Sequence, residues 1–129
     1  MSLARALPFF IIAAACIIIS PASAAPSFNC KKAGGLVEKQ ICGSREFEPL
    51  DRDIAELYTR SLAMLGKTDA DALREEQRAW VKERDACEDM IRGNPPIVTD
   101  VLMCMRKTMR ERKTRLQAIL DRKQFFPKD

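Results

Sequence analysis

Histidine is missing from this 129-residue chain, and its absence narrows the functions that the sequence can support. Histidine is the side chain most often used as a general base and as a metal ligand near neutral pH. The chain also has no glycine-rich phosphate loop and no G-x-S-x-G nucleophile elbow. We therefore expect no catalytic residue, no cofactor and no bound metal, which indicates a binding protein rather than an enzyme.

Strand signals are scarce as well, because β-branched residues rarely alternate with polar ones. Apolar residues instead recur every three or four positions, as in amphipathic helices. We expect helices over residues 36–42, 50–65, 68–91 and 97–122, with Gly66 and residues 93–96 as breaks. In the last helix the predicted apolar stripe is Val98, Val101, Leu102, Met105, Met109, Leu116, Ile119 and Leu120. Short connections favour antiparallel neighbours, so the predicted fold class is all-α, a small three- to four-helix bundle.

Only one long apolar run is present, and it lies at the N-terminus. Arg5 precedes an apolar stretch over residues 7–19, and small residues follow at 20–24. This is the layout of a cleaved signal peptide, and the run is shorter than the ~20 residues that cross a bilayer. We expect residues 1–25 to be removed and residues 26–129 to form one periplasmic or secreted domain. A retained anchor and a lipoprotein attached to the membrane through Cys16 are the alternatives.

Removing this segment leaves four cysteines, an even number that is typical of a disulfide framework in a small exported chain. Four cysteines allow three pairings, and the sequence does not choose among them. We prefer the local pairs Cys30–Cys42 and Cys87–Cys104, because each would close a short loop. A zinc site is the competing interpretation, but it favours C-x-x-C pairs and often histidine, and the chain has neither.

Several polar residues fall beside the single tryptophan and form a predicted structural cluster. Gln77 and Arg84 share the inward helix face of Trp80, and a buried arginine needs an acceptor. Asp51, near the start of the preceding helix, is the expected partner of Arg84. The full predicted cluster is Asp51, Tyr58, Gln77, Trp80, Arg84 and Asp85. We favour support of the bundle over ligand binding as its role.

Two charged stretches are interpreted as solvated helix faces. The acidic one is Glu46, Glu48, Asp51, Asp53 and Glu56, where negative charge at a helix N-terminus is favoured by the helix dipole. The basic one runs over residues 106–115 and contains no aromatic residues. Acid–base chemistry by the first and nucleic-acid binding by the second are the less favoured alternatives. Residues 26–129 hold 21 basic and 18 acidic side chains, a modest net charge of +3.

Two segments carry a family resemblance when they are taken together. The first is V-E-K-x-I-C at residues 37–42, and the second is E-Q-R-A-W-x-x-x-R-D-x-C at residues 76–87. With Cys30, Leu50-Asp51 and Leu57-Tyr58, they resemble the N-terminal domain of the LprI family of bacterial lysozyme inhibitors. The resemblance extends from Cys30 to about Leu120. It implies an exported helical domain and, for the namesake branch, a protein partner, lysozyme.

The shared residues are mostly those that we interpret as scaffold, so we expect inhibitory contacts on exposed loops. Animal lysozymes are strongly basic, and a slightly basic chain gains no long-range attraction to them. Two local docking modes are predicted: acidic residues such as Glu46, Glu48 and Asp53 facing the basic enzyme, or Arg92 entering a carboxylate-lined cleft. The alternative function is a non-inhibitory envelope or stress module that binds periplasmic proteins or cell-wall components. The sequence does not indicate the oligomeric state.

Overall fold

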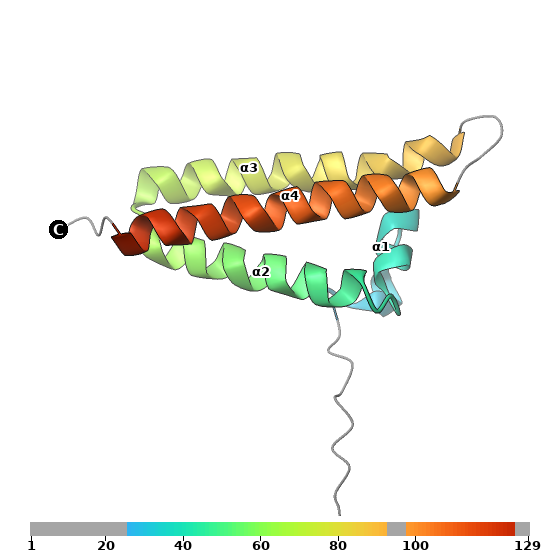
Figure 1. Cartoon of the computed structure of the whole chain (residues 1–129), viewed down its shortest axis with the longest axis horizontal. Helices are drawn as coiled ribbons and strands as arrows, with labels where there is room; N and C mark the ends of the chain where they lie inside the picture. The colour runs from blue at the N-terminus through green and yellow to red at the C-terminus, as the bar shows by residue number, and fades with distance from the viewer. Residues whose placement is uncertain (1–25, 93–97, 126–129) are drawn as a thin grey trace, which may run out of the picture.

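The computed structural model describes residues 26–92 and 98–125, with side chains to residue 122, and all its regular elements are helical (Figure 1). The elements in chain order are η1 (Cys30–Lys32), α1 (Leu36–Ile41), α2 (Phe47–Met64), α3 (Lys67–Asp85), η2 (Ala86–Arg92) and α4 (Val98–Phe125). This confirms the predicted all-α bundle. The predicted signal segment at 1–25 and the whole of the predicted break at 93–96 lie outside the described residues.

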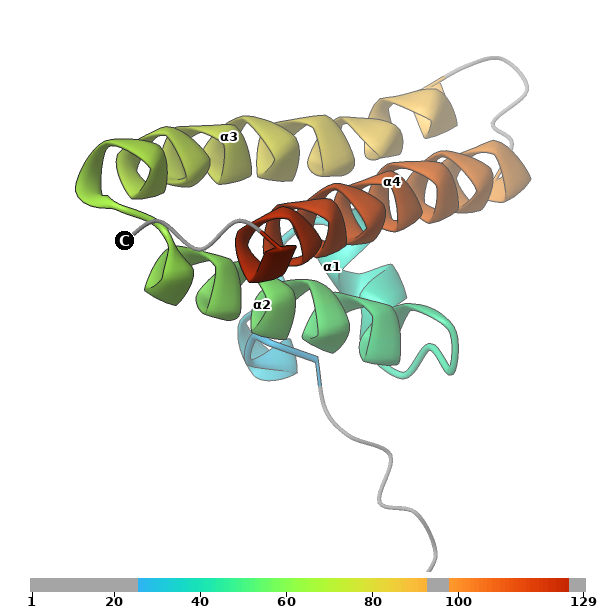
Figure 2. The same ribbon diagram turned by 60° about the vertical axis from the view of Figure 1, so that its left-hand side comes forward.

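The three long helices form the bundle, and α1 lies across one end of it (Figures 1 and 2). Helix α3 runs antiparallel to both α2 and α4, so α2 and α4 run parallel to each other. Helix α4 contacts α2, α3 and η2, while α1 contacts α2, α3 and η2. The long helix α4 therefore holds the other parts of the fold together.

The apolar core lies between these helices and follows the predicted spacing closely. Its fully buried members on α4 are Val101, Met105, Met109 and Leu116. Val98 was predicted on the same stripe, but it is 50% exposed. It is the first residue of α4, one turn before Val101, which is the first buried residue of that helix.

Most helix boundaries differ from the predicted ones by one to three residues, and the differences in α2 and α3 have structural causes or consequences. Helix α2 begins at Phe47 rather than Leu50, because the Ser44 hydroxyl accepts the backbone N–H of Phe47 at 3.0 Å and the Phe47 side chain is buried. Helix α3 begins at Lys67, one residue before the expected start. The predicted single helix over 68–91 ends as an α-helix at Asp85 and continues as the 3-10 turn η2.

Two disulfides fasten the short elements to the bundle, and they are the local pairs. Cys30–Cys42 joins η1 to the end of α1, and Cys87–Cys104 joins η2 to α4. They close loops of 12 and 17 residues, and loops of this length contribute about 3 kcal/mol each by reducing the entropy of the unfolded chain. No helix within the described ranges combines the length and apolar character needed to cross a membrane.

Candidate functional site

Trp80 lies at the centre of the predicted polar cluster, between two arginines. The guanidinium carbon of Arg84 is 5.5 Å from the ring centroid, and that of Arg112 is 5.9 Å from it. The indole N–H donates to the backbone carbonyl of Thr108 at 3.2 Å, so α3 is joined to α4 by a buried hydrogen bond. Because the indole and both guanidinium groups are mostly buried, these contacts position helices rather than offer a free surface.

Arg84 has the acceptor that its burial requires. Its Nη1 lies 3.8 Å from Oδ1 of Asp51, the partner predicted from the sequence, and Asp51 is only 4% exposed. Arg84 also donates from Nε and Nη2 to Oδ1 of Asp85 at 2.9 and 2.7 Å. Oδ2 of Asp51 accepts the backbone N–H of Ser27 at 2.7 Å. The pair therefore joins α2, α3 and the segment before η1.

The other predicted members of the cluster sit at its edge. Gln77 accepts a hydrogen bond from Nε of Arg112 at 2.9 Å through its Oε1. Tyr58 is partly buried and packs against the apolar core. A structural role for the cluster stays a prediction, and the contacts of Trp80, Arg84 and Asp51 support it.

Sequence reasoning missed Arg112, which it placed on an exposed basic face. The residue is 4% exposed, and besides Gln77 it contacts Glu76, which accepts from its Nη1. A signal for this was available, because Arg112 falls between Met109 and Leu116 at the three- and four-residue spacing of the core stripe. The interpretation of residues 106–115 as a wholly solvated face was wrong at this position.

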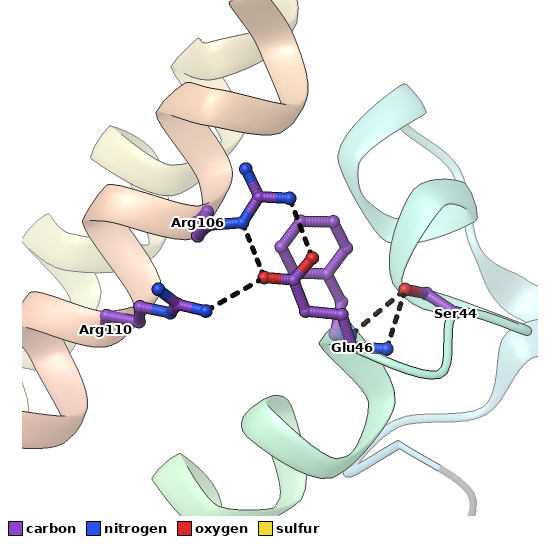
Figure 3. A network of polar contacts seen from close by, with 5 residues as sticks. Ser44, Glu46, Arg106 and Arg110 are labelled. Atoms are coloured by element: carbon purple, nitrogen blue, oxygen red, sulfur yellow. Dashed lines mark hydrogen bonds and ion pairs between the residues drawn. The ribbon is translucent and has the colours of Figure 1, made fainter. Parts of the chain in front are cut away.

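Glu46 in the loop before α2 and Asp53 of α2 bind basic residues of α4, and Figure 3 shows the contacts of Glu46. Glu46 accepts hydrogen bonds from Arg106 at 2.6 and 2.8 Å and from Arg110 at 3.3 Å. Asp53 accepts from Nζ of Lys113 at 2.7 Å. Both Glu46–Arg106 and Asp53–Lys113 span 60 residues, so the two parallel helices keep one register over two helical turns.

This pairing changes how the predicted acidic docking patch is interpreted. The hydrogen bond from Arg106 lowers the pKa of Glu46 below its ordinary value, so the carboxylate is ionised and engaged. Asp51 is buried, and Glu48 accepts the backbone N–H of Gly43 at 2.6 Å. Docking through Glu46, Glu48 and Asp53 stays a prediction, but the positive charges beside Glu46 and Asp53 weaken it.

Three exposed apolar side chains belong to η2 and the first two turns of α4, at one end of the bundle. Met90 is 48% exposed, Val98 50% and Met103 57%. Arg92 ends η2, and its Nε lies 3.3 Å from Oδ1 of Asp89. We call Met90, Arg92, Val98 and Met103 the tip. Arg92, the last predicted binding residue, is therefore at this end of the bundle and is distant in the chain from Glu46, Glu48 and Asp53.

The residues offer little for metal or covalent chemistry. Over 26–92 and 98–125, no three His, Cys, Asp or Glu side chains come together in a way that could hold a metal ion. All four cysteines of this region are in disulfides, so none is available as a thiolate nucleophile. The described surface instead carries exposed apolar side chains at the tip and exposed charged side chains, which suit contact with another molecule.

Comparison with known proteins gives one match. Residues 29–116 match the protein family described as "Lysozyme inhibitor LprI", a span that begins just before η1 and ends within α4. No curated protein and no solved structure matches the chain. Because the match covers more than half of the chain, including both disulfides, the Trp80 cluster and the tip, the chain belongs to the LprI family.

Proposed function

We propose that this chain is an exported binding protein that inhibits lysozyme, or a related muramidase, by direct protein–protein contact. The observation that carries the proposal is the family match over residues 29–116, because the family is described as a lysozyme inhibitor and the match covers most of the bundle. The family is one of inhibitors rather than enzymes.

The architecture suits an inhibitor that must survive outside the cytoplasm. Two disulfides reduce the conformational entropy of the unfolded chain. The Trp80 cluster and the α2–α4 ion pairs join the helices. A rigid surface loses little conformational entropy on binding, which leaves more of the contact energy for affinity.

The charge balance indicates how binding would be achieved. Residues 26–129 carry a net charge of +3, so a basic lysozyme is not attracted over long distances. Affinity must therefore come from a local contact surface with a low dissociation rate rather than from steered association.

The test is lysis of a peptidoglycan suspension by a panel of animal, goose-type and bacterial muramidases, with the processed, oxidised protein titrated in. Saturable inhibition near one-to-one stoichiometry is expected for at least one enzyme. Inhibition of none would contradict the proposal and favour the non-inhibitory envelope module, whose partner would then be sought by pull-down.

Export is part of the same proposal and has its own measurement. We propose that residues 1–25 are a signal peptide, so the intact mass of the exported protein should correspond to a chain that begins at Ala25 or Pro26. A mature chain that begins with a lipidated Cys16 would instead incorporate a palmitate analogue and would remain with the membrane fraction.

A further inference from the structure

We infer that a groove between α3 and α4 is the surface that docks on a basic lysozyme, by taking up arginine or lysine side chains of the enzyme. The inference rests on the proposed function and adds to it the contact surface and the chemistry that this surface recognises. It starts from two hollows that the structure leaves along these two helices, which lie side by side (Figures 1 and 2).

The two hollows adjoin and form one groove. The first has a volume of about 310 Å³ and lies between the start of α3 and the last turns of α4. The second, of about 280 Å³, lies between the middle parts of the two helices. Glu76 of α3 and Arg115 of α4 line both. The α3 wall extends from Asp69 to Glu83, which is about 21 Å along the helix. We call this surface the α3–α4 groove.

Apolar side chains form much of the floor of the α3–α4 groove. Leu73 and Trp80 of α3 are buried beneath it, and Ile119 of α4 is half-buried against the core. Ala72 and Ala79 also line it, and both are exposed. Because alanine has a small side chain, these two positions leave the groove open to a side chain from another molecule.

The charged residues of the α3–α4 groove are not balanced once their contacts are considered. The acidic ones are Asp69, Glu76, Glu83 and Glu111, and the basic ones are Arg112, Arg115 and Arg122. Arg112 and Arg115 both bind Glu76, so these two cations already have a carboxylate within the groove. Arg122 lines only the first hollow. The second hollow therefore has Glu83 and Glu111 in its lining and no cation that is free to neutralise them.

Carboxylates without a partner are concentrated in this groove. Of the acidic residues within 26–92 and 98–122, four have no hydrogen bond or ion pair with another described residue. They are Asp69, Glu83, Asp100 and Glu111, and all but Asp100 line the α3–α4 groove. Glu46 and Asp53, in contrast, already bind arginine and lysine side chains of α4. The groove is thus a local reversal of sign on a chain whose residues 26–129 are net positive.

An arginine or lysine side chain of a partner matches both features of the α3–α4 groove. Its aliphatic stem covers apolar surface while its charged head remains close to water, where the carboxylates of the groove walls lie. Hydrogen bonds from a guanidinium or ammonium group to a carboxylate are charge-assisted and stronger than those between neutral groups. Because Asp69, Glu83 and Glu111 are exposed, pairing them does not carry the desolvation cost of a fully buried ion pair.

A basic lysozyme supplies such side chains on its surface. The inhibitor gains no attraction to it over long distances, so charge complementarity has to be local, and the α3–α4 groove supplies it. Arginine is also one of the residues enriched at protein–protein interfaces. The free carboxylates and the apolar floor together indicate the cationic side chains of the enzyme as the occupant.

The first test compares two triple variants that change the net charge equally. The groove variant is Asp69→Asn/Glu83→Gln/Glu111→Gln. The control variant is Glu56→Gln/Glu75→Gln/Asp100→Asn, and none of its three positions lines the groove. All six side chains are exposed, so both proteins should keep the helical circular dichroism of the unmodified protein.

The second test fills the α3–α4 groove without changing its carboxylates. Ala79→Lys places a long cationic side chain at the second hollow, where it would occupy the position of a side chain from the enzyme. Ala63→Lys is the matched control, because Ala63 is an exposed helical alanine of α2 that does not line the groove. Lysine has a high helix propensity, so both substitutions are compatible with their helices.

The measurement is the dissociation constant, by titration calorimetry, for each lysozyme that the processed, oxidised protein inhibits. We expect the groove variant and Ala79→Lys to raise it at least tenfold, because each removes close charge pairs from the interface, and both controls to change it less than about threefold. Added salt should weaken binding of the unmodified protein more than that of the groove variant, because salt screens exposed ion pairs.

The outcomes separate the two proposals. If the unmodified protein inhibits and the groove and control variants bind equally well, or lose affinity equally, the inference is wrong while the proposed function stands. If Ala79→Lys binds as well as the unmodified protein, no side chain of the enzyme enters the second hollow, which also overturns the inference. If the unmodified protein inhibits no lysozyme, the proposed function fails, and the inference fails with it.

Discussion

Arg112 of α4 lies against the ring of Trp80 of α3, with its guanidinium carbon 5.9 Å from the ring centroid. On the same ring, Arg84 of α3 is at 5.5 Å. A single tryptophan thus contacts two mostly buried arginines. Arg112 donates to Gln77 and Glu76, whereas Arg84 donates to Asp85 and forms an ion pair with Asp51. The first two predictions test how far this arrangement stabilises the bundle.

Replacing Arg112 with alanine should destabilise the fold. The change removes the contact with Trp80 and the hydrogen bonds to Gln77 and Glu76, and it leaves space in the core. Glu76 keeps Arg115 as a partner and is partly exposed, so we expect a loss of about 1–3 kcal/mol rather than the full cost of an unpaired buried charge. Urea unfolding followed by circular dichroism measures it.

Arg112→Lys is the companion variant. Lysine keeps the charge but lacks the forked donors that reach two acceptors, so its stability should lie between those of the unmodified protein and the alanine variant. Unchanged stability in both variants would contradict a structural role for Arg112.

Replacing Asp51 with alanine should cost more stability than replacing it with asparagine. Alanine removes both the acceptor for the Ser27 N–H and the carboxylate near Arg84, which is 6% exposed. Breaking a buried pair costs about 3–5 kcal/mol, and the remaining contact of Arg84 with Asp85 reduces this. Asparagine keeps an acceptor for Ser27. Equal unfolding midpoints in urea for the two variants would show that the acceptor for Ser27 contributes little, and the midpoint of the asparagine variant relative to the unmodified protein measures the loss of the charge.

Acid should weaken the link between Glu46 and α4. The pKa of Glu46 is lowered in the folded protein, chiefly by the hydrogen bond from Arg106. Its contribution to stability is therefore present above its ordinary pKa of 4.5 and is lost as the pH falls through the lower folded value. The carboxylate is more than one third exposed, so we expect less than about 1 kcal/mol at pH 7.

Glu46→Gln measures this contribution. The variant should be slightly less stable than the unmodified protein at pH 7, and the difference should disappear at a pH below the folded pKa of Glu46. Urea midpoints for both proteins across this pH range give the comparison. A difference that persisted after the carboxyl group was protonated would show that Glu46 acts through packing and not through its charge.

The two disulfides should differ in their sensitivity to reduction. Cys30 is exposed, whereas Cys87 is 1% exposed and belongs to the apolar core. A water-soluble phosphine should therefore reduce Cys30–Cys42 first under native conditions. Alkylation followed by mass mapping gives the order, and reduction of Cys87–Cys104 first would show that the end of the bundle opens more readily than its burial implies.

Local patterns in the sequence were enough to predict the helices and the fold class. Apolar spacing placed the long helices to within a few residues, because burial of one helix face requires that spacing wherever the partner lies. Asp51 was correctly expected near Arg84, since a buried guanidinium needs an acceptor and α2 and α3 run antiparallel. The resemblance to the LprI family was also visible in local segments, residues 37–42 and 76–87, which lie within the matched span of residues 29–116.

Contacts between distant segments required the tertiary structure. The burial of Arg112 depends on Trp80, Gln77 and Glu76, which are more than 30 residues away in the chain. Without those contacts, an arginine in a basic stretch is predicted to be exposed because of its residue type. The hydrogen bonds between Glu46 and Arg106 require α2 and α4 to lie side by side and parallel. That arrangement arises because α3 runs antiparallel to both helices.

The sequence by itself therefore determined an all-helical chain with four cysteines available for pairing and the family to which it belongs, because these depend on local spacing and residue types. Only the tertiary structure decided which charges are engaged and which apolar side chains are left exposed. Val98 and Met103 lie on the same helix as the buried Val101 and Met105. Val98 shares their stripe but is the first residue of α4, whereas Met103 lies on the face that the bundle leaves exposed. Exposure of these side chains therefore depends on their place in the bundle, which only the tertiary structure decides.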